Sequence, residues 1–263
     1  LSTSIGALVH ELQKERGMSV GFISSGGANF ADKLPGQRDE ASRRIDGYHA
    51  MLSGFDASRH AGLPPLLTET KTLLGDLPAK RQAVTSFALT PPQAGAHYTK
   101  TIASLLSVAG RTSNLSSDRE IARLAAAYHA LLQAKERAGI ERATLAGVFG
   151  DNRFSQDAQV RFLSNSAAQE TWFSVFAGVA DEDQMAFFNG KMTGPVVDEV
   201  ARVKKDAISK MHEAALGMDA KAWFAASSKR IDVLKEVEDR LADDLSSGIR
   251  RLETKSTMIA SVY

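Results

Sequence analysis

Two short segments of this 263-residue chain carry the same Glu-Arg pair, and arginine is well suited to holding a small oxyanion. Glu15–Ile23 aligns with Glu141–Phe149 at a constant offset of 126 residues, with glutamate, arginine and one glycine identical in both copies. A glycine-containing loop and then a phenylalanine, Phe30 or Phe154, follow each copy. We infer that the chain contains an internal duplication.

Each arginine of the motif interrupts an apolar stripe that has helical spacing. Residues three and four apart along a helix share one face, and an apolar face packs against a partner helix. Both Arg16 and Arg142 are therefore predicted to face the interior. The two stripes are Ile5, Val9, Leu12, Arg16, Ser19 and Ile23, and Ile121, Leu124, Tyr128, Leu131, Lys135, Ala138, Arg142, Leu145 and Phe149.

A guanidinium in such a position needs an anion, because it is always charged and leaving it buried and unpaired costs roughly 3–5 kcal/mol. Its planar fork of N–H donors matches a planar oxyanion through two parallel hydrogen bonds. Glu15 and Glu141 are next to the arginines in sequence, but adjacent helical residues point about 100° apart, so we expect them to pair elsewhere. A carboxylate from another helix is the alternative to an external anion.

Helices must position these residues, because helical periodicity dominates the chain and strand-type alternation is almost absent. The seven prolines fall where a helical pattern begins or a turn is expected. The expected helices run from Ser4 to Ser25, from Leu34 to Ser53, from Pro64 with an interruption near Gly75 and Pro78, from Pro91 to Thr112, from the Ser116–Asp118 cap to Phe149, from Ser155 to Gly178, from Asp181 with a restart after Gly194-Pro195, and from Asp219 onward.

Eight helices with short connections predict an all-α fold made of two antiparallel four-helix bundles related by the duplication. The first half is expected at residues 1–115. The second is expected at 116–263, and it ends in a long stalk helix. We interpret the regular apolar stripe of that helix as a packing seam, and we expect the protein to be a homodimer. The stripe consists of Ile231, Leu234, Val237, Leu241, Leu245 and Ile249.

The composition is that of a globular domain, with 43% hydrophobic and 24% charged residues. A net charge of +1 gives no single-sign field, so no nucleic-acid partner is predicted. The absence of cysteine rules out disulfides and thiolate sites, and it is compatible with the periplasm. No run of 18 apolar residues is present, but the helical pattern is already under way at Leu1. We therefore expect a segment of a longer protein whose flanks include membrane helices.

The sequence predicts neither an enzyme nor a bound cofactor or metal. The six histidines lack metal-ligand spacing, and the motifs of nucleotide loops and nucleophile elbows are absent. Asp181–Asp183 is interpreted as the negatively charged first turn of a helix. Lys204-Lys205 is interpreted as a solvated face, and Trp223-Phe224 as core or interface anchors, with the core favoured.

The motif residues also resemble a known family. Leu8–Ser19 is similar to the opening of the NIT family, which senses nitrate and nitrite and typically reads Leu-x-x-Glu-Arg-Gly, then a glycine loop, then Gln-Arg. Gln37-Arg38 supplies that last pair here. Lys135–Ala143 resembles the family's Lys-Glu-x-x-Gly-x-Glu-Arg-Ala, and the resemblance extends over about Leu8 to Lys210.

The resemblance implies two four-helix bundles and a nitrate or nitrite site between the first and fifth helices, to which each motif contributes its arginine. On this chain the arginines are Arg16 and Arg142, and the motif residues Gly17, Ser19 and Gly139 complete the predicted ligand-binding set. Members occur as extracytoplasmic parts of chemoreceptors, histidine kinases and cyclases, and in a cytoplasmic regulator. A periplasmic region of an inner-membrane receptor is therefore expected, with the cytoplasm as the alternative.

The leading hypothesis is a sensor of nitrate or nitrite that relays its signal through its terminal helices to a transmembrane or downstream output module. One alternative keeps the fold but changes the ligand to another small anion or metabolite. The other alternative is a structural or protein-docking module in which the arginines form internal salt bridges.

Overall fold

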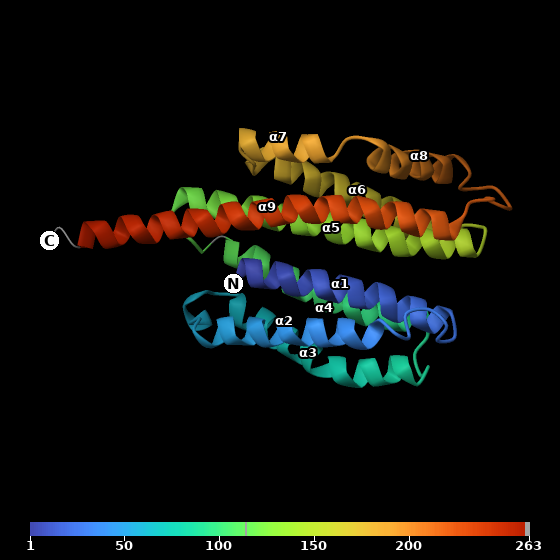
Figure 1. The fold of residues 1–263 in the computed structure, drawn as a ribbon, viewed down its shortest axis with the longest axis horizontal. Helices are drawn as coiled ribbons and strands as arrows, with labels where there is room; N and C mark the ends of the chain where they lie inside the picture. The colour runs from blue at the N-terminus through green and yellow to red at the C-terminus, as the bar shows by residue number, and fades with distance from the viewer. Residues whose placement is uncertain (114, 261–263) are drawn as a thin grey trace. The chain divides into compact units, whose positions relative to one another are not determined.

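A computed structural model of the chain describes residues 1–113 and 115–260, with side chains to residue 255. Within these residues all regular structure is helical, which confirms the predicted all-α class (Figure 1). The chain divides into two compact units, Leu1–Leu115, called unit 1, and Ser116–Tyr263, called unit 2.

Unit 1 is built from α1 (Ser2–Ser24), α2 (Leu34–Ser53), α3 (Leu63–Thr85) and α4 (Pro91–Ser113), with a short 3-10 turn at Ala57–Arg59. Helix α1 packs against α2 and α4, and α4 packs against α3 (Figure 1). The helix that carries the first Glu-Arg pair therefore packs mainly against α2 and α4, with a smaller contact to α3.

Unit 2 repeats this order with its third element broken in two. It consists of α5 (Arg119–Gly150), α6 (Gln156–Val179), α7 (Glu182–Lys191), α8 (Pro195–Ser209) and α9 (Ala220–Ala260). Helix α5 packs against α6 and α9, and α9 packs against α7 and α8. The same neighbour relations in both units support the duplication inferred from the sequence.

Predicted polar caps open two helices of unit 2, α5 and α7. The Asp118 carboxylate accepts a hydrogen bond from the Ile121 N–H at 3.0 Å and starts α5. Asp181 forms a capping box with Gln184 at the start of α7, as expected for an acidic first turn. These caps satisfy N–H groups that have no partner within the helix.

The two motif-bearing helices end in the same way. After α1 the Gly27 N–H donates to the Phe22 carbonyl at 2.9 Å, and after α5 the Arg153 N–H donates to the Val148 carbonyl at 3.2 Å. Each bond spans five residues and closes a helix end through a left-handed residue. Asn152, with φ of 55°, occupies that position in unit 2 where the first copy has a glycine.

The interruption expected in the third helix is absent from the structure. Helix α3 runs without a break through Gly75 and Pro78, although an interruption was expected there. Proline removes one helical hydrogen bond and crowds the preceding turn. The buried side chains of Leu74, Leu77 and Val84 hold the helix on both sides of it. Tertiary packing therefore overrides the local preference.

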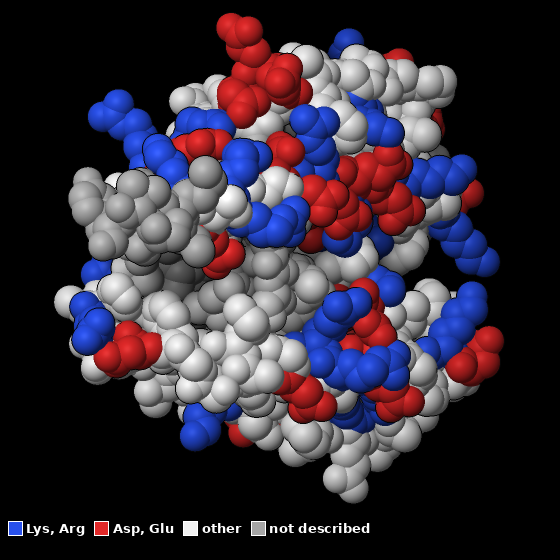
Figure 2. Space-filling view, turned by 60° about the vertical axis from the view of Figure 1, so that its left-hand side comes forward, with Lys and Arg blue, Asp and Glu red and all other residues white. Residues whose placement is uncertain are grey.

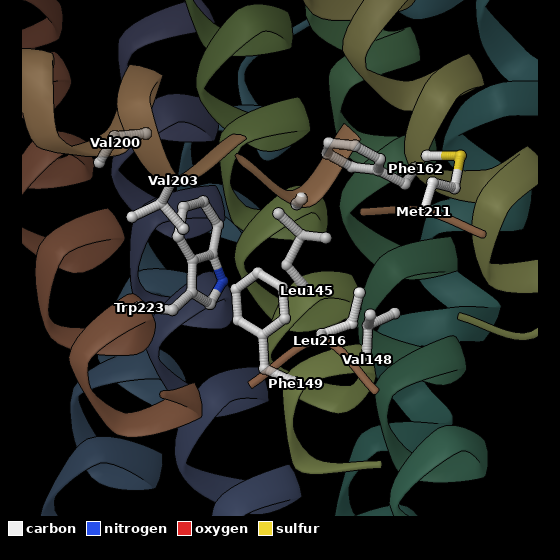
Figure 3. Close-up of a cluster of buried hydrophobic side chains, with 10 residues drawn as sticks. Leu145, Val148, Phe149, Phe162, Val200, Val203, Met211, Leu216 and Trp223 are labelled. Atoms are coloured by element: carbon white, nitrogen blue, oxygen red, sulfur yellow. The ribbon is translucent and has the colours of Figure 1, made fainter. Parts of the chain in front are cut away.

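An apolar cluster in unit 2 fixes the part of α5 that follows Arg142. Figure 3 shows Trp223 of α9 beside Phe149 of α5, and their ring centroids are 6.0 Å apart at an angle of 79°. Such edge-to-face contacts stabilise aromatic pairs beyond the burial of their area. The buried members are Leu145, Val148, Phe149, Phe162, Val200, Val203, Ala207, Met211, Leu216 and Trp223.

The apolar stripe of α9 is a packing seam inside unit 2, because α9 lies against α5 and most of the stripe is buried. Ile249, at its outer end, is 40% exposed. The seam also contains a buried ion pair between Lys135 of α5 and Glu238 of α9. Lys135 thus obtains a carboxylate from another helix, as a cation in an apolar stripe requires.

The face shown in Figure 2 interleaves basic and acidic side chains and carries no broad patch of one sign among the residues drawn in colour. Among the described residues, no helix combines the length and apolar character needed to cross a bilayer.

Candidate functional site

Arg16 lies on the buried face of α1 and is 4% exposed, as its place in the apolar stripe predicts. Its NH1 group donates a hydrogen bond to Oγ1 of Thr99 on α4, at 2.9 Å. The Thr99 hydroxyl donates in turn to the Gly95 carbonyl one turn earlier, at 2.9 Å. The Thr99 hydroxyl is therefore oriented by its own helix and presents its oxygen to the arginine.

Arg142 occupies the matching place on α5 and is half-buried. Its NH1 group donates to Oγ of Ser228 on α9 at 2.8 Å, and its guanidinium carbon lies 4.6 Å from the centre of the Phe224 ring. Phe224, for which the sequence favours the core over an interface, is only partly buried and lies against this cation. The backbone of Arg142 is also held, because the indole N–H of Trp223 donates to its carbonyl at 3.0 Å.

Glu15 is fully buried and is held by residues other than its neighbour Arg16. Arg81 of α3 binds it in a bidentate pair, Nε to Oε1 at 2.7 Å and NH2 to Oε2 at 2.8 Å. The Tyr98 hydroxyl donates to Oε1 at 2.7 Å. Burial first, and then the charge of Glu15, raise the pKa of Tyr98, so it remains a neutral donor. Burial alone would lower the pKa of Arg81, but the hydrogen bond and charge of Glu15 outweigh it and raise the pKa.

Glu141 has the same role in unit 2 with different partners. It is fully buried and accepts from Arg230 of α9 at 3.0 Å and from Ser166 of α6 at 3.1 Å. Lys204 of α8 pairs at 2.6 Å with Oε2, the oxygen that also accepts from Ser166, while Arg230 binds Oε1. The prediction that Lys204 belongs to a solvated face is therefore wrong. A lysine stem can lie along apolar surface while its head reaches a buried carboxylate.

The second helix of each unit supports the motif helix through an amide. In unit 1 the Gln37 side chain donates to the Glu11 carbonyl at 3.0 Å, and in unit 2 the Asn165 side chain donates to the Arg137 carbonyl at 2.8 Å. Glu11 and Arg137 are themselves 126 residues apart, the offset of the motif. Arg38, the second residue of the family's Gln-Arg pair, donates to the Arg81 carbonyl at 3.1 Å and so joins the ion-pair network of Glu15.

The remaining predicted ligand residues lie beside the arginines in sequence. Gly17 is partly buried on α1, and Gly139 is buried on α5 one turn before Arg142. Ser19 is fully buried, and its hydroxyl lies 3.3 Å from that of Tyr98. Since the Tyr98 proton goes to Glu15, the Ser19 hydroxyl donates to Tyr98 and extends that chain of hydrogen bonds. Direct ligand contact by these three residues remains a prediction.

Sequence reasoning missed the groups that hold the motif, most notably Thr99, Ser228, Arg81 and Arg230. Thr99 and Arg81 lie 83 and 66 residues from their partners, and Ser228 and Arg230 lie 86 and 89 residues from theirs. The available signal was a buried carboxylate beside each arginine, which required a cation from another helix. Across the described residues, no group of histidines and carboxylates is arranged to hold a metal ion.

Each of the two helical units carries one Glu-Arg motif on its first helix, α1 or α5. The chain belongs to the family described as "Nitrate and nitrite sensing", whose sequence profile matches residues 7–246. It is 27% identical over 245 residues to a nitrate regulatory protein of Klebsiella oxytoca, which covers 93% of this chain and 61% of that protein. The chain therefore spans about three fifths of that relative.

A solved structure has the same fold. The structure titled "Structure of the NasR transcription antiterminator" superposes with a TM-score of 0.87 at 26% identity, over 96% of this chain and 68% of that one. This match and the family profile confirm the predicted family and all-α fold. Neither match addresses the receptor context that was expected from the resemblance.

Proposed function

We propose that this chain is the input domain of a nitrate- or nitrite-responsive regulator and that Arg16 and Arg142 are its anion ligands. The observation that carries the proposal is the equivalent setting of the two arginines. Each follows a buried glutamate that is held by cations of other helices, and each donates to a hydroxyl on the last helix of its own unit. A guanidinium so fixed can present its donors to a planar oxyanion in the plane of the group.

Calorimetry with nitrate, nitrite, chloride and sulfate tests the proposal on the wild-type chain. Nitrate or nitrite should bind, and Arg16→Ala and Arg142→Ala should each weaken binding by about tenfold or more, since a charged hydrogen bond contributes roughly 1.5–3 kcal/mol. Arg16→Lys should also bind weakly, because lysine keeps the charge but loses the planar fork. The measured stoichiometry gives the number of anions per chain.

Matched controls are the exposed arginines Arg43 on α2 and Arg202 on α8, which form ion pairs within their own helices. Arg43→Ala and Arg202→Ala should bind nitrate like the wild type. Absence of heat with both nitrate and nitrite, or full affinity in Arg16→Ala and Arg142→Ala, would contradict the proposal. Binding heat with a different anion, but not with nitrate or nitrite, would favour a sensor of another ligand. Absence of binding heat with every anion tested would favour the protein-docking module.

The signal is proposed to leave through the terminal helices α1 and α9, each of which contributes to one of the arginine settings. The relatives are named a regulatory protein and a transcription antiterminator, which favours an output on transcription over the chemoreceptor expected from the resemblance. An extracytoplasmic location gains no support from those names. Nitrate should change hydrogen-exchange protection in α1 and α9, and unchanged protection in both would contradict the relay.

A further inference from the structure

We propose that Thr99 and Ser228 are positioning residues that fix the guanidinium groups of Arg16 and Arg142 for anion binding. The inference rests on the proposed function and adds to it the groups that orient the two anion-binding arginines. Each hydroxyl oxygen accepts from NH1 of its arginine, at 2.9 Å for Thr99 and 2.8 Å for Ser228. Both hydroxyls come from the final helix of their unit, α4 or α9.

A hydroxyl suits this task because it accepts without neutralising the cation. A carboxylate at the same place would form a salt bridge and compete with the ligand. A neutral acceptor uses one of the five N–H donors of a guanidinium and limits its rotation, while the group keeps its full charge. An arginine loses considerable rotamer freedom when it is ordered. Ordering it before the anion arrives removes that entropy loss from the binding step.

The Thr99 hydroxyl is oriented in a way that suits an acceptor, and Ser228 acts together with an aromatic ring on its own helix. Thr99 donates its proton to the Gly95 carbonyl of its own helix, so its lone pairs are directed outward, toward Arg16. Ser228 lies one helical turn after Phe224, so the two side chains share a face of α9. The Phe224 ring covers one face of the Arg142 guanidinium while Ser228 holds its NH1 group. An anion is then directed to the edge of the guanidinium plane, where the N–H donors lie.

Neighbouring hydroxyls on the same two helices provide matched controls for these contacts. Thr101 also lies on α4, is buried and, like Thr99, donates to the carbonyl four residues earlier, that of His97, whereas Thr99 in addition accepts from Arg16. Ser227, beside Ser228, is buried, and its hydroxyl donates to the Trp223 carbonyl. Thr101→Val and Ser227→Ala therefore remove a hydroxyl of the same type from the same helix and leave the arginine contact intact.

The first test measures nitrate affinity by calorimetry on the full chain. Thr99→Val keeps the shape of threonine and Ser228→Ala removes only the hydroxyl, and each should weaken nitrate binding by about tenfold, with unchanged stoichiometry. Thr99→Ser restores the acceptor and should bind within about twofold of wild type. Wild-type affinity in Thr99→Val and Ser228→Ala, or equal losses in Thr101→Val and Ser227→Ala, would overturn the assignment.

A second readout does not depend on the ligand and so separates this inference from the proposed function. The Nε–Hε order parameters of Arg16 and Arg142 can be measured by NMR without added anion, with assignments from Arg16→Lys and Arg142→Lys. Thr99→Val should lower the order parameter of Arg16 alone, and Ser228→Ala that of Arg142 alone. Unchanged order parameters in both variants would overturn the positioning role even if nitrate binds. If the order parameters fall but the protein does not bind nitrate, the positioning role is retained and nitrate is rejected as the ligand.

Discussion

Units 1 and 2 meet the same electrostatic demand with different residues. In unit 1 the buried Glu15 is paired by Arg81 of α3 and bonded by Tyr98 of α4. In unit 2 the buried Glu141 is paired by Arg230 of α9 and also by Lys204 of α8. A carboxylate in the core of a bundle needs a cation, but any adjacent helix can supply it. The duplicated motif therefore requires a cation for its buried glutamate, but it does not determine which helix supplies that cation.

The arginines differ in one further way. The residue four positions before the hydroxyl is Gly95 in unit 1 and Phe224 in unit 2, so an aromatic ring lies against Arg142 at the place where α4 has no side chain. A cation over an aromatic face gains about 0.5–1 kcal/mol at a partly exposed site. Unit 2 thus holds its arginine by a hydroxyl and a ring, whereas the last helix of unit 1 offers a hydroxyl at the corresponding turn.

The largest expected difference between the units comes from their ion pairs. Arg81→Met leaves the buried Glu15 without its paired cation and should lower the free energy of unfolding by about 3–5 kcal/mol. Lys204→Met should cost only about 1 kcal/mol, because Glu141 keeps Arg230. Denaturant titration followed by circular dichroism measures both.

The double variant Arg81→Met/Glu15→Gln separates charge from packing in that comparison. It removes both charges and should recover part of the stability lost in Arg81→Met. Equal losses in Arg81→Met and Lys204→Met would show that the second cation of unit 2 gives no protection.

A partly buried histidine, His129, is expected to contribute to the pH response of unit 2. Burial lowers the pKa of His129, which lies edge-on to Trp172, from 6.5 to about 4. Between these values the unfolded chain binds the proton and the folded chain does not, so stability falls as the pH falls through this window. The free energy of unfolding should be about 2 kcal/mol lower at about pH 5 than at about pH 7.5 from this group alone.

Tryptophan fluorescence reports this unfolding, since both tryptophans, Trp172 and Trp223, lie in unit 2. His129→Leu should flatten the pH dependence, whereas replacing the exposed His212 by Gln should leave it unchanged. An equally steep dependence in His129→Leu would assign the effect to other groups.

The smallest effect concerns the shared glycine of the motif. A Cβ on Gly21 would lie 2.7 Å from the Phe30 ring, whereas a Cβ on the exposed Gly147 would meet no atom within 4 Å. Gly21→Ala should therefore destabilise the chain by about 1 kcal/mol through overpacking. Gly147→Ala should stabilise it by about 0.5–1 kcal/mol through helix propensity. Melting temperatures that shift in the same direction for both variants would show that the two glycines are equivalent after all.

Local sequence patterns were sufficient to locate most of the helices and the buried face of α1. Caps such as Asp118 and Asp181, and the glycine after α1, act within one turn, so a local pattern is sufficient to locate them. The three- and four-residue spacing placed Arg16 inward because helical geometry fixes which residues share a face. The helix break expected near Pro78 does not occur, because the packing of buried side chains on both sides of the proline outweighs its local tendency to end a helix.

The surroundings of the motif, in contrast, depend on how the helices pack. Thr99, Ser228, Arg81 and Arg230 lie 66 to 89 residues from the side chains they contact. Which of them meets the motif depends on the helices that pack against α1 and α5 and on their rotation about their own axes. The spacing of apolar residues along one helix shows which of its faces is buried, but it shows neither which helices pack against that face nor how they are rotated. The two Glu-Arg pairs were therefore visible in the sequence, while the hydroxyls and cations that hold them emerged only when the helices packed.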